Sequence, residues 1–311
     1  MRVLITGGSG YIGSILGPFL SAHGHRVRVL DVERRPANFN YPKTAGARIQ
    51  FMKGDMRNAD IIDSALAGAD AIVHLAAVVG YPACLRNPAL TVDTNVNATK
   101  LLLESRRIDQ KLIFASTGSV YGPVQDRVCT EVTATTPSTL YGQTKLEGET
   151  LTLAAGNCII YRYATGFGLS PNMRYDLLPN NFLRQALTNG RIRLFEGSSR
   201  RSFIHVHDIA RSILFGLDTW TNLADDVFNV GNEQMNCTKA ELAQLVRELV
   251  SYELELDEFD TDPDQRNYNV SYEKIRRRGF ATTQTLASGL TQVLSSLQPI
   301  GLARSSHPPN L

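Results

Sequence analysis

Short apolar runs alternate with longer amphipathic stretches through the first half of the chain. The apolar runs predict β-strands at residues 2–5, 26–30, 49–52, 71–74, 111–115 and 158–161. Between most of them, apolar residues recur at helical spacing, which predicts helices near residues 11–22, 58–66, 88–106 and 138–154. Alternating strands and helices are typical of α/β proteins with a parallel, doubly wound sheet, and we expect this fold class.

The alternation of predicted strands and helices becomes less regular after residue 165. A turn-rich stretch at 166–172 precedes a predicted helix near 179–188, short strands around 191–195 and 202–206, a possible return to the sheet at 227–230, and helical stretches at 238–250 and 271–278. We therefore predict a sheet domain of residues 1–165 plus about 202–232. Residues 166–201 and 233–311 would form a smaller, discontinuous lobe with no clean linker between the two parts.

The first predicted strand runs directly into a glycine-rich turn, Thr6-Gly-Gly-Ser-Gly-Tyr-Ile-Gly13, and then into a helix. Gly7 would allow the tight turn, Gly10 would bring the backbone close to phosphate, and Gly13 would let helix and strand pack. The free N–H groups of a helix amino terminus favour a bound anion. The run predicts a Rossmann-type dinucleotide site, whereas a loop that merely turns is the simpler alternative.

Asp31 ends the second predicted strand, about 20 residues beyond the glycine loop, where a carboxylate can accept hydrogen bonds from ribose hydroxyls. This position favours NAD over NADP as the cofactor. Arg34 and Arg35 follow closely and leave an alternative open, because they could bind a 2′-phosphate or simply be solvated loop charges.

Composition narrows the range of partners and compartments. Lysine and arginine number 32 against 30 acidic residues, a formal charge of +2 that gives no reason to expect nucleic acid or a membrane surface as partner. The four cysteines show no C-x-x-C pair, which favours reduced thiols and no metal site. A strand beginning at residue 2 and the lack of an apolar run of about 18 residues lead us to expect a cytoplasmic protein.

Tyr141 and Lys145 stand four residues apart in a predicted helix, so their side chains share one face. A phenolate at neutral pH requires the tyrosine pKa to fall by about three units from ~10, on the order of 4 kcal/mol. A neighbouring ammonium and an oxidised nicotinamide could supply that together, which would make Tyr141 a base. Helix packing plus a surface charge is the alternative for this pair.

Thr117 follows the strand at 111–115, at a carboxyl end where open α/β sheets keep their crevices. Its hydroxyl could hydrogen-bond a reacting sugar hydroxyl. Alternatively, Ser116 and Thr117 only satisfy the backbone of a turn.

Several further runs complete a pattern shared with one family: Gly54-Asp55-Met-Arg57, His74-Leu-Ala-Ala77, Asn95, Arg162-Tyr163, Arg201-Ser-Phe-Ile-His205-Val-His-Asp208 and Phe228-Asn-Val-Gly231. With the glycine loop, Thr117, Tyr141 and Lys145, they make the chain resemble the extended short-chain dehydrogenase/reductases. The resemblance is strongest to the NAD-dependent nucleotide-sugar epimerase/dehydratase group, and it covers nearly the whole chain. It implies bound NAD, a nucleotide-diphosphate sugar as substrate and, by analogy, a homodimer.

The resemblance also implies roles for single residues. Thr117, Tyr141 and Lys145 would form the catalytic triad. The implied cofactor contacts are Gly7, Gly10, Tyr11, Ile12, Gly13, Asp31, Asp55, Met56, Leu75, Ala76, Ala77, Asn95, Tyr141 and Lys145. The implied substrate contacts are Tyr81, Thr117, Asn180, Arg201 and Arg266, with Asn180 and Arg201 on the diphosphate. The spacing around Arg266 departs from the family pattern, and a surface cation is the alternative for Arg201.

The residues after Thr117 bear on the reaction that the resemblance implies. Dehydratases of this group carry an acid/base pair there, but this chain has Gly118 and Ser119, neither of which titrates usefully. A 4-epimerase acting through a transient 4-ketosugar needs no such pair, and it is the function we predict. The alternatives are a dehydratase in which Cys129 or Glu131 replaces the pair, a ketoreductase, and a dinucleotide-sensing protein without activity.

The residues do not determine which sugar the substrate carries. Ala164-Thr165 stands where many epimerases carry asparagine, and Ser202 replaces the usual aspartate after Arg201. Tyr81 and the run Met173-Arg-Tyr175 would meet the sugar or serve the core or a hinge.

Overall fold

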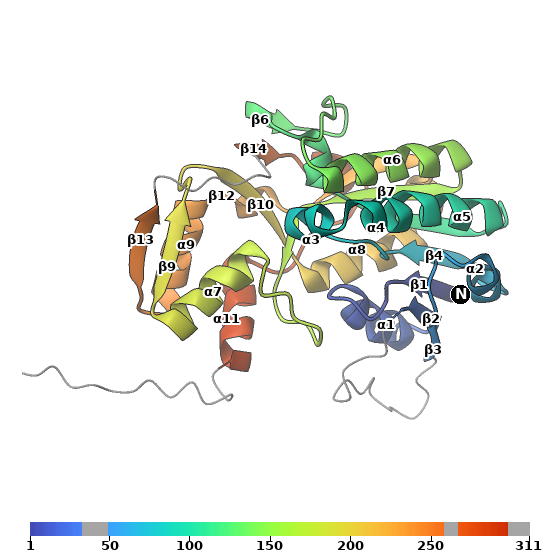
Figure 1. The fold of residues 1–311 in the computed structure, drawn as a ribbon, viewed down its shortest axis with the longest axis horizontal. Coiled ribbons are helices and arrows are strands. Elements are labelled where there is room, and N and C mark those ends of the chain that lie inside the picture. The colour runs from blue at the N-terminus through green and yellow to red at the C-terminus, as the bar shows by residue number, and fades with distance from the viewer. Residues whose placement is uncertain (33–48, 258–266, 298–311) are drawn as a thin grey trace, which may run out of the picture.

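The computed structural model describes residues 1–32, 49–257 and 267–297, and its centre is a seven-stranded sheet (Figure 1). The strand order is β11-β7-β5-β4-β1-β2-β3, and all neighbouring strands run parallel. These strands are β1 (Arg2–Thr6), β2 (Arg26–Asp31), β3 (Ile49–Lys53), β4 (Ala71–His74), β5 (Lys111–Thr117), β7 (Cys158–Tyr163) and β11 (Asp226–Val230). The predicted doubly wound α/β fold is confirmed, and the run at 227–230 does return to the sheet.

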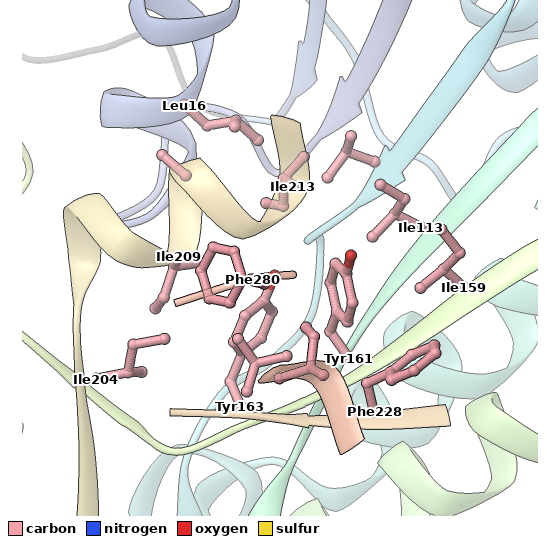
Figure 2. Close-up of a cluster of buried hydrophobic side chains, with 14 of the residues drawn as sticks. Leu16, Ile113, Ile159, Tyr161, Tyr163, Ile204, Ile209, Ile213, Phe228 and Phe280 are labelled. Carbon is pink, nitrogen blue, oxygen red and sulfur yellow. The ribbon is translucent and has the colours of Figure 1, made fainter. Parts of the chain in front are cut away.

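Helices cover both faces of the sheet because alternate strand residues point to opposite sides. In β1, Val3 and Ile5 pack in one core with α1 (Gly13–Ala22) and α8 (Val206–Asp218), whereas Leu4 packs in another with α2 (Ala59–Leu66) and α5 (Ala98–Ser105). Figure 2 shows the first core, in which side chains of α1 and α8 meet side chains of β5 and β7. Cover on both faces explains why β4 and β7 are buried along their whole length, whereas β2 and β3, at one edge of the sheet, keep polar residues such as Arg26 and Gln50.

The order of the strands places a crevice at the middle of the sheet. β1 and β4 are neighbours, yet β2 and β3 continue on one side while β5, β7 and β11 continue on the other. In open α/β sheets, ligands bind beyond the carboxyl ends of the strands at such a switch point. The glycine loop follows β1 directly at this point.

The single helix predicted at 88–106 is interrupted in the structure. It consists of α4 (Pro88–Val92), a π-helical turn (Asp93–Asn97) and α5, which ends at Ser105. Single π-turns inside helices occur frequently at functional sites. Here the turn carries Asn95, whose role in the crevice is described below.

A smaller lobe lies at one end of the molecule, away from the large sheet (Figure 1). It contains α7 (Leu178–Asn189), α9 (Lys239–Leu249), α11 (Leu286–Leu297) and the paired strands β9 (Arg191–Phe195) and β13 (Glu253–Asp257). Their apolar faces form a separate core. The predicted boundary at residue 202 falls inside β10 (Arg200–His205), where Phe203 packs in the core of the small lobe and Ile204 in that of the sheet.

The strand expected at 202–206 ends at His205, one residue earlier than predicted. The next residue, Val206, begins α8, a helix that the sequence did not predict. His205 caps this helix by accepting a hydrogen bond from the His207 backbone, and histidine is not among the usual capping residues. The remaining described helices are α3 (Tyr81–Arg86), α6 (Leu140–Ala155) and α10 (Glu273–Arg277). Among the short strands, β6 (Gln125–Cys129) pairs with β14 (Asn267–Val270), while β8 (Thr165–Phe167) and β12 (Asn236–Thr238) lie on either side of β10. Short 3₁₀ turns span Gly118–Tyr121, Trp220–Asn222 and Glu233–Met235.

Candidate active site

A cleft of about 910 Å³ opens at the carboxyl ends of β1, β2 and β4. Its lining includes most of the cofactor contacts predicted from the sequence: Gly7, Gly10, Tyr11, Ile12, Gly13, Asp31, Asp55, Met56, Leu75, Ala76 and Ala77. The other predicted contacts, Asn95, Tyr141 and Lys145, lie outside this lining. The cleft has the size and the place expected of a dinucleotide site.

The glycine loop at one wall of the cleft has no room for side chains. Gly7 has a φ of +69°, and a Cβ there would lie 2.7 Å from the Cα of Ala76. A Cβ on Gly13 would lie 2.4 Å from the Cα of Gly8, and one on Gly10 would lie 3.2 Å from the Gly7 carbonyl oxygen. These glycines therefore allow the loop, the neighbouring strand and α1 to approach one another closely.

The same loop fits the diphosphate of a dinucleotide. Within the described residues, the amino terminus of α1 has no side-chain cap, so no side chain occupies the N–H groups that a bound anion would use. The Ser9 hydroxyl also borders the cleft, and within the described residues it is buried without a hydrogen-bond partner. An orphaned hydroxyl beside an uncapped helix terminus is a donor arrangement that suits a phosphate oxygen.

Two carboxylates border the cleft beyond the loop. The Ser9 backbone N–H donates to Asp31 Oδ2 at 2.9 Å, which holds this carboxylate beside the glycine turn. Asp55 accepts hydrogen bonds from the Arg57 side chain, and these hold the pKa of its carboxyl below the usual range. Arg57 also pairs with Asp93 at 3.1 Å. Arg34 and Arg35 lie outside the described residues.

Asn95 shapes the opposite wall of the cleft. Its amide oxygen accepts from the Val78 backbone N–H at 2.7 Å, and its amide nitrogen donates to the Val78 carbonyl at 3.0 Å and to the Thr144 hydroxyl at 3.1 Å. Val78 lines the cleft, so the π-helical turn that carries Asn95 fixes the wall to α6.

The structure brings the predicted catalytic residues together from two elements. Tyr141 and Lys145 lie one turn apart on α6, and Thr117 ends β5. A Cβ on Gly142 would lie 2.8 Å from the Ser119 carbonyl oxygen, so the start of α6 lies close against the turn after Thr117. The Thr117 hydroxyl accepts a hydrogen bond from the Ser119 N–H at 3.2 Å, which satisfies one backbone donor of that turn.

Lys145 is buried, and its ammonium lies 4.1 Å from the centroid of the Phe114 ring. Burial lowers the pKa of Lys145 to about 8, although the carboxylate of Glu149 acts in the opposite direction. The ammonium is therefore still charged near neutral pH, where it can stabilise an anion on Tyr141.

A buried ion pair beneath this helix escaped the sequence analysis. The Glu149 carboxylate accepts from Arg162 on β7, with Nη2 2.8 Å from Oε2, and it also accepts from the Ser116 hydroxyl next to Thr117. Arg162 continues the network by donating to the Tyr121 hydroxyl at 3.2 Å. The sequence analysis named Arg162 as part of the family pattern but gave it no partner, and Glu149 is marked only by following Lys145 by one helical turn.

The predicted substrate contacts are more dispersed than the cofactor contacts. Arg201 is buried on β10 and borders a small cavity of about 20 Å³ with Gly118 and Tyr268, outside the large cleft. Tyr81 begins α3, and the next two residues of this helix line the cleft. Arg266 lies outside the described residues.

Asn180 is fully buried between the two lobes. Its amide oxygen accepts from the Gly168 N–H at 3.1 Å, and its amide nitrogen donates to the Arg174 carbonyl at 3.0 Å and approaches the Tyr11 hydroxyl at 3.4 Å. The side chain is thus engaged by the protein itself, in contacts that join the small lobe to the glycine loop.

Comparison with known proteins gives a consistent assignment. Residues 3–231 match the model of the NAD dependent epimerase/dehydratase family. The chain is 30% identical to a dTDP-glucose 4,6-dehydratase of Streptomyces niveus, over 94% of this chain and 92% of that protein. It is 26% identical to a UDP-glucose 4-epimerase of Corynebacterium glutamicum, over 81% of each.

One solved structure is similar to this chain in both fold and sequence. The UDP-glucuronic acid 4-epimerase of Bacillus cereus, in complex with UDP-glucuronic acid and NAD, is 25% identical and superimposes with a TM-score of 0.84. The match covers 96% of this chain and all of the other. No helix in the described part of this chain is long and apolar enough to cross a membrane.

Proposed function

Since the chain belongs to the NAD-dependent epimerase/dehydratase family, we propose that it is a nucleotide-diphosphate-sugar 4-epimerase that acts through a transient 4-ketosugar. The observation that carries this proposal is the environment of Thr117. Gly118 and Ser119 follow it, so the turn beside the catalytic helix contains no carboxylic acid or carboxylate. An epimerase needs only one acid/base group, whereas loss of water from the sugar requires more.

The two groups named above as substitutes for a dehydratase pair, Cys129 and Glu131, are poorly placed for that role. Cys129 is fully buried in the sheet core, and burial raises the pKa of its thiol to about 11. One carboxylate oxygen of Glu131 accepts from the Asn229 backbone N–H at 2.8 Å. Both residues therefore support the epimerase over the dehydratase.

In the proposed mechanism, NAD held by the glycine loop and Asp31 would supply a reversible hydride acceptor next to the sugar. The Tyr141 oxygen takes the proton of the C4 hydroxyl as the C4–H bond breaks, which leaves a 4-ketosugar. Lys145 stabilises the tyrosinate through its positive charge, and the Thr117 hydroxyl orients the sugar oxygen. After the ketosugar rotates within the site, the hydride would return to the opposite face of C4, and Tyr141 gives its proton back to the C4 oxygen.

We assign NAD to residues 1–165 with about 202–232, and the sugar nucleotide to the remaining lobe. Arg201 would hold the substrate diphosphate from β10, where it lines the same small cavity as Gly118. We also propose a cytoplasmic homodimer formed by the outer faces of the helical segment from α4 to α5 and of α6, which expose Val92 and Leu153 respectively. Analytical ultracentrifugation distinguishes this dimer from a monomer.

The test replaces Tyr141 by phenylalanine. Turnover of the nucleotide sugar should fall by at least about 100-fold, the usual contribution of a general base, while the purified variant keeps its NAD. Tyr252→Phe is the matched control, because Tyr252 lies in the small lobe and bonds the Ala243 carbonyl. Undiminished turnover in Tyr141→Phe would refute the assignment of the base.

A further inference from the structure

Residues 168–176, here named the strap, run from β8 to the start of α7 and lie against the glycine loop. The Ser170 hydroxyl donates to the Tyr11 carbonyl at 2.7 Å, and the Asn172 amide donates to the Ser9 carbonyl at 2.9 Å. In the other direction, the Tyr11 hydroxyl donates to the Gly168 carbonyl at 2.7 Å. The strap therefore ties the small lobe to the loop that fits the cofactor diphosphate.

These contacts leave the binding face of the loop open. The strap donors bond carbonyl oxygens of the loop, and the Ser170 hydroxyl also meets that of Ser14 at 3.0 Å. Backbone N–H groups and the orphaned Ser9 hydroxyl are the groups that suit a phosphate. A bound diphosphate and the strap would thus use different atoms of the same loop and can be present together.

Arg174 is the strap residue that extends over the cleft. Its side chain lines the cleft, and Nη2 lies 3.6 Å from the position that a Cβ on Gly80 would occupy at the start of α3. Asp176 accepts from its Nε at 3.1 Å, and Asn180 holds its backbone carbonyl. The guanidinium is therefore fixed across the cleft, between the glycine loop and the opposite wall.

The hydrogen bonds of Arg174 leave part of the guanidinium available for an anion. Asp176 engages Nε and Nη2, whereas Nη1 has no acceptor within hydrogen-bonding distance among the described residues. Of the two other cations described in the cleft lining, Arg57 is already paired with Asp55 and Asp93, whereas Arg86 lies exposed at the end of α3. Arginine presents donors in a geometry that suits phosphate oxygens.

From this geometry, we propose that Arg174 binds the diphosphate of NAD and that the strap holds the cofactor in the cleft from one turnover to the next. The strap is anchored to Ser9 and Tyr11, on the loop that cradles the same diphosphate. Dissociation of NAD would therefore require the strap to lift or the Arg174 contact to break. This inference rests on NAD as the cofactor and holds whichever sugar reaction the enzyme performs.

The experiment measures how fast the purified holoenzyme releases NAD in the absence of any sugar nucleotide. Excess alcohol dehydrogenase and ethanol convert released NAD to fluorescent NADH, so the signal reports dissociation and not epimerisation. We expect Arg174→Gln to release NAD at least 10-fold faster than the unmodified protein and Arg174→Lys to be intermediate. Arg247→Gln is the matched control, because Arg247 is an exposed arginine of α9 that stacks on Tyr252, outside the strap; its release rate should be unchanged.

A second variant tests the strap without changing charge. Asn172→Ala removes the bond to the Ser9 carbonyl and should also accelerate release. An unchanged release rate in Arg174→Gln would overturn the proposal, and a raised KM for the nucleotide sugar with unchanged release would assign Arg174 to the substrate instead. Thermal unfolding of each apoprotein identifies a variant that fails to fold, in which case Arg174→Lys and Asn172→Ala decide the question.

Discussion

The carboxylate of Glu149 and the guanidinium of Arg162 form a buried ion pair, with Nη2 2.8 Å from Oε2, beneath the helix that carries Tyr141 and Lys145. The Glu149 side chain is 2% exposed and that of Arg162 is 7% exposed. Water can therefore compensate little if one partner is removed. The pair joins α6 to β7 and, through Ser116, to the end of β5.

Glu149→Gln should destabilise the protein by about 3–5 kcal/mol, because it leaves the Arg162 charge buried without its counterion. Urea unfolding followed by circular dichroism measures the change. The control is Asp109→Asn, which breaks the exposed pair of Asp109 with Arg107 and should leave stability near that of the unmodified protein. Equal stability of the two variants would mean that the buried pair contributes nothing.

The charge on Lys145 predicts the alkaline side of the pH profile. Burial lowers the pKa of Lys145 to about 8, and Glu149 opposes this shift. Turnover should therefore decline as the pH rises past about 8 and the ammonium is lost. Lys145→Arg, which stays charged, should remove this decline from whatever activity remains. A decline at the same pH in Lys145→Arg would assign it to another group.

Gly7 and Gly24 provide a matched pair for the glycine loop. Both have positive φ, but a Cβ on Gly7 would lie 2.7 Å from the Ala76 backbone, whereas nothing lies within 4 Å of one on Gly24. Gly24→Ala should cost about 1–2 kcal/mol from backbone strain and leave NAD binding intact. Gly7→Ala should cost about 1–3 kcal/mol more and weaken NAD binding at least 10-fold. Urea unfolding and NAD titration of the apoproteins measure both effects; identical behaviour would show that the loop tolerates a side chain.

Two buried histidines predict sensitivity to acid. Burial lowers the pKa of His74 to about 3 and that of His205 to about 4, whereas both would titrate near 6.5 in the unfolded chain. The unfolded state therefore binds more protons below pH 6.5, and stability falls as the pH drops from about 6.5 towards 4. Each histidine contributes a slope of about 1.4 kcal/mol per pH unit in that window.

Urea unfolding between pH 7 and 5 tests this slope. His74→Asn should lower it by about 1.4 kcal/mol per pH unit, whereas His23→Asn, at an exposed position, should leave it unchanged. An unaltered slope in His74→Asn would assign the acid sensitivity to other groups.

The large sheet could be predicted from the sequence because its central strands are apolar on both faces and most successive strands are separated by helices. The join of β10 and α8 could not, because no turn residue or standard capping residue marks it and His205 ends the strand and caps the helix. β10 also pairs with short strands from two other parts of the chain, β8 and β12, a contact that no local pattern encodes.

The candidate active site likewise has parts that the sequence predicts and parts that only the fold brings together. The glycine loop and Asp31 are local patterns, and the structure places them in one cleft. The Glu149–Arg162 pair joins a helix to a strand, and the strap meets a loop more than 150 residues away, so both depend on tertiary contacts. Arg201 stands on a recognisable motif, yet its position outside the large cleft became visible only in the folded chain.

The most direct test of the proposed reaction is to follow deuterium placed at C4 of the nucleotide sugar. The holoenzyme is incubated with C4-deuterated sugars of a UDP, dTDP, GDP and CDP panel, and products are analysed by mass spectrometry and NMR. A 4-epimerase predicts a product of unchanged mass that carries the deuterium at C4 in the inverted configuration. Loss of water with deuterium at C6, or net consumption of the cofactor, would contradict the epimerase assignment.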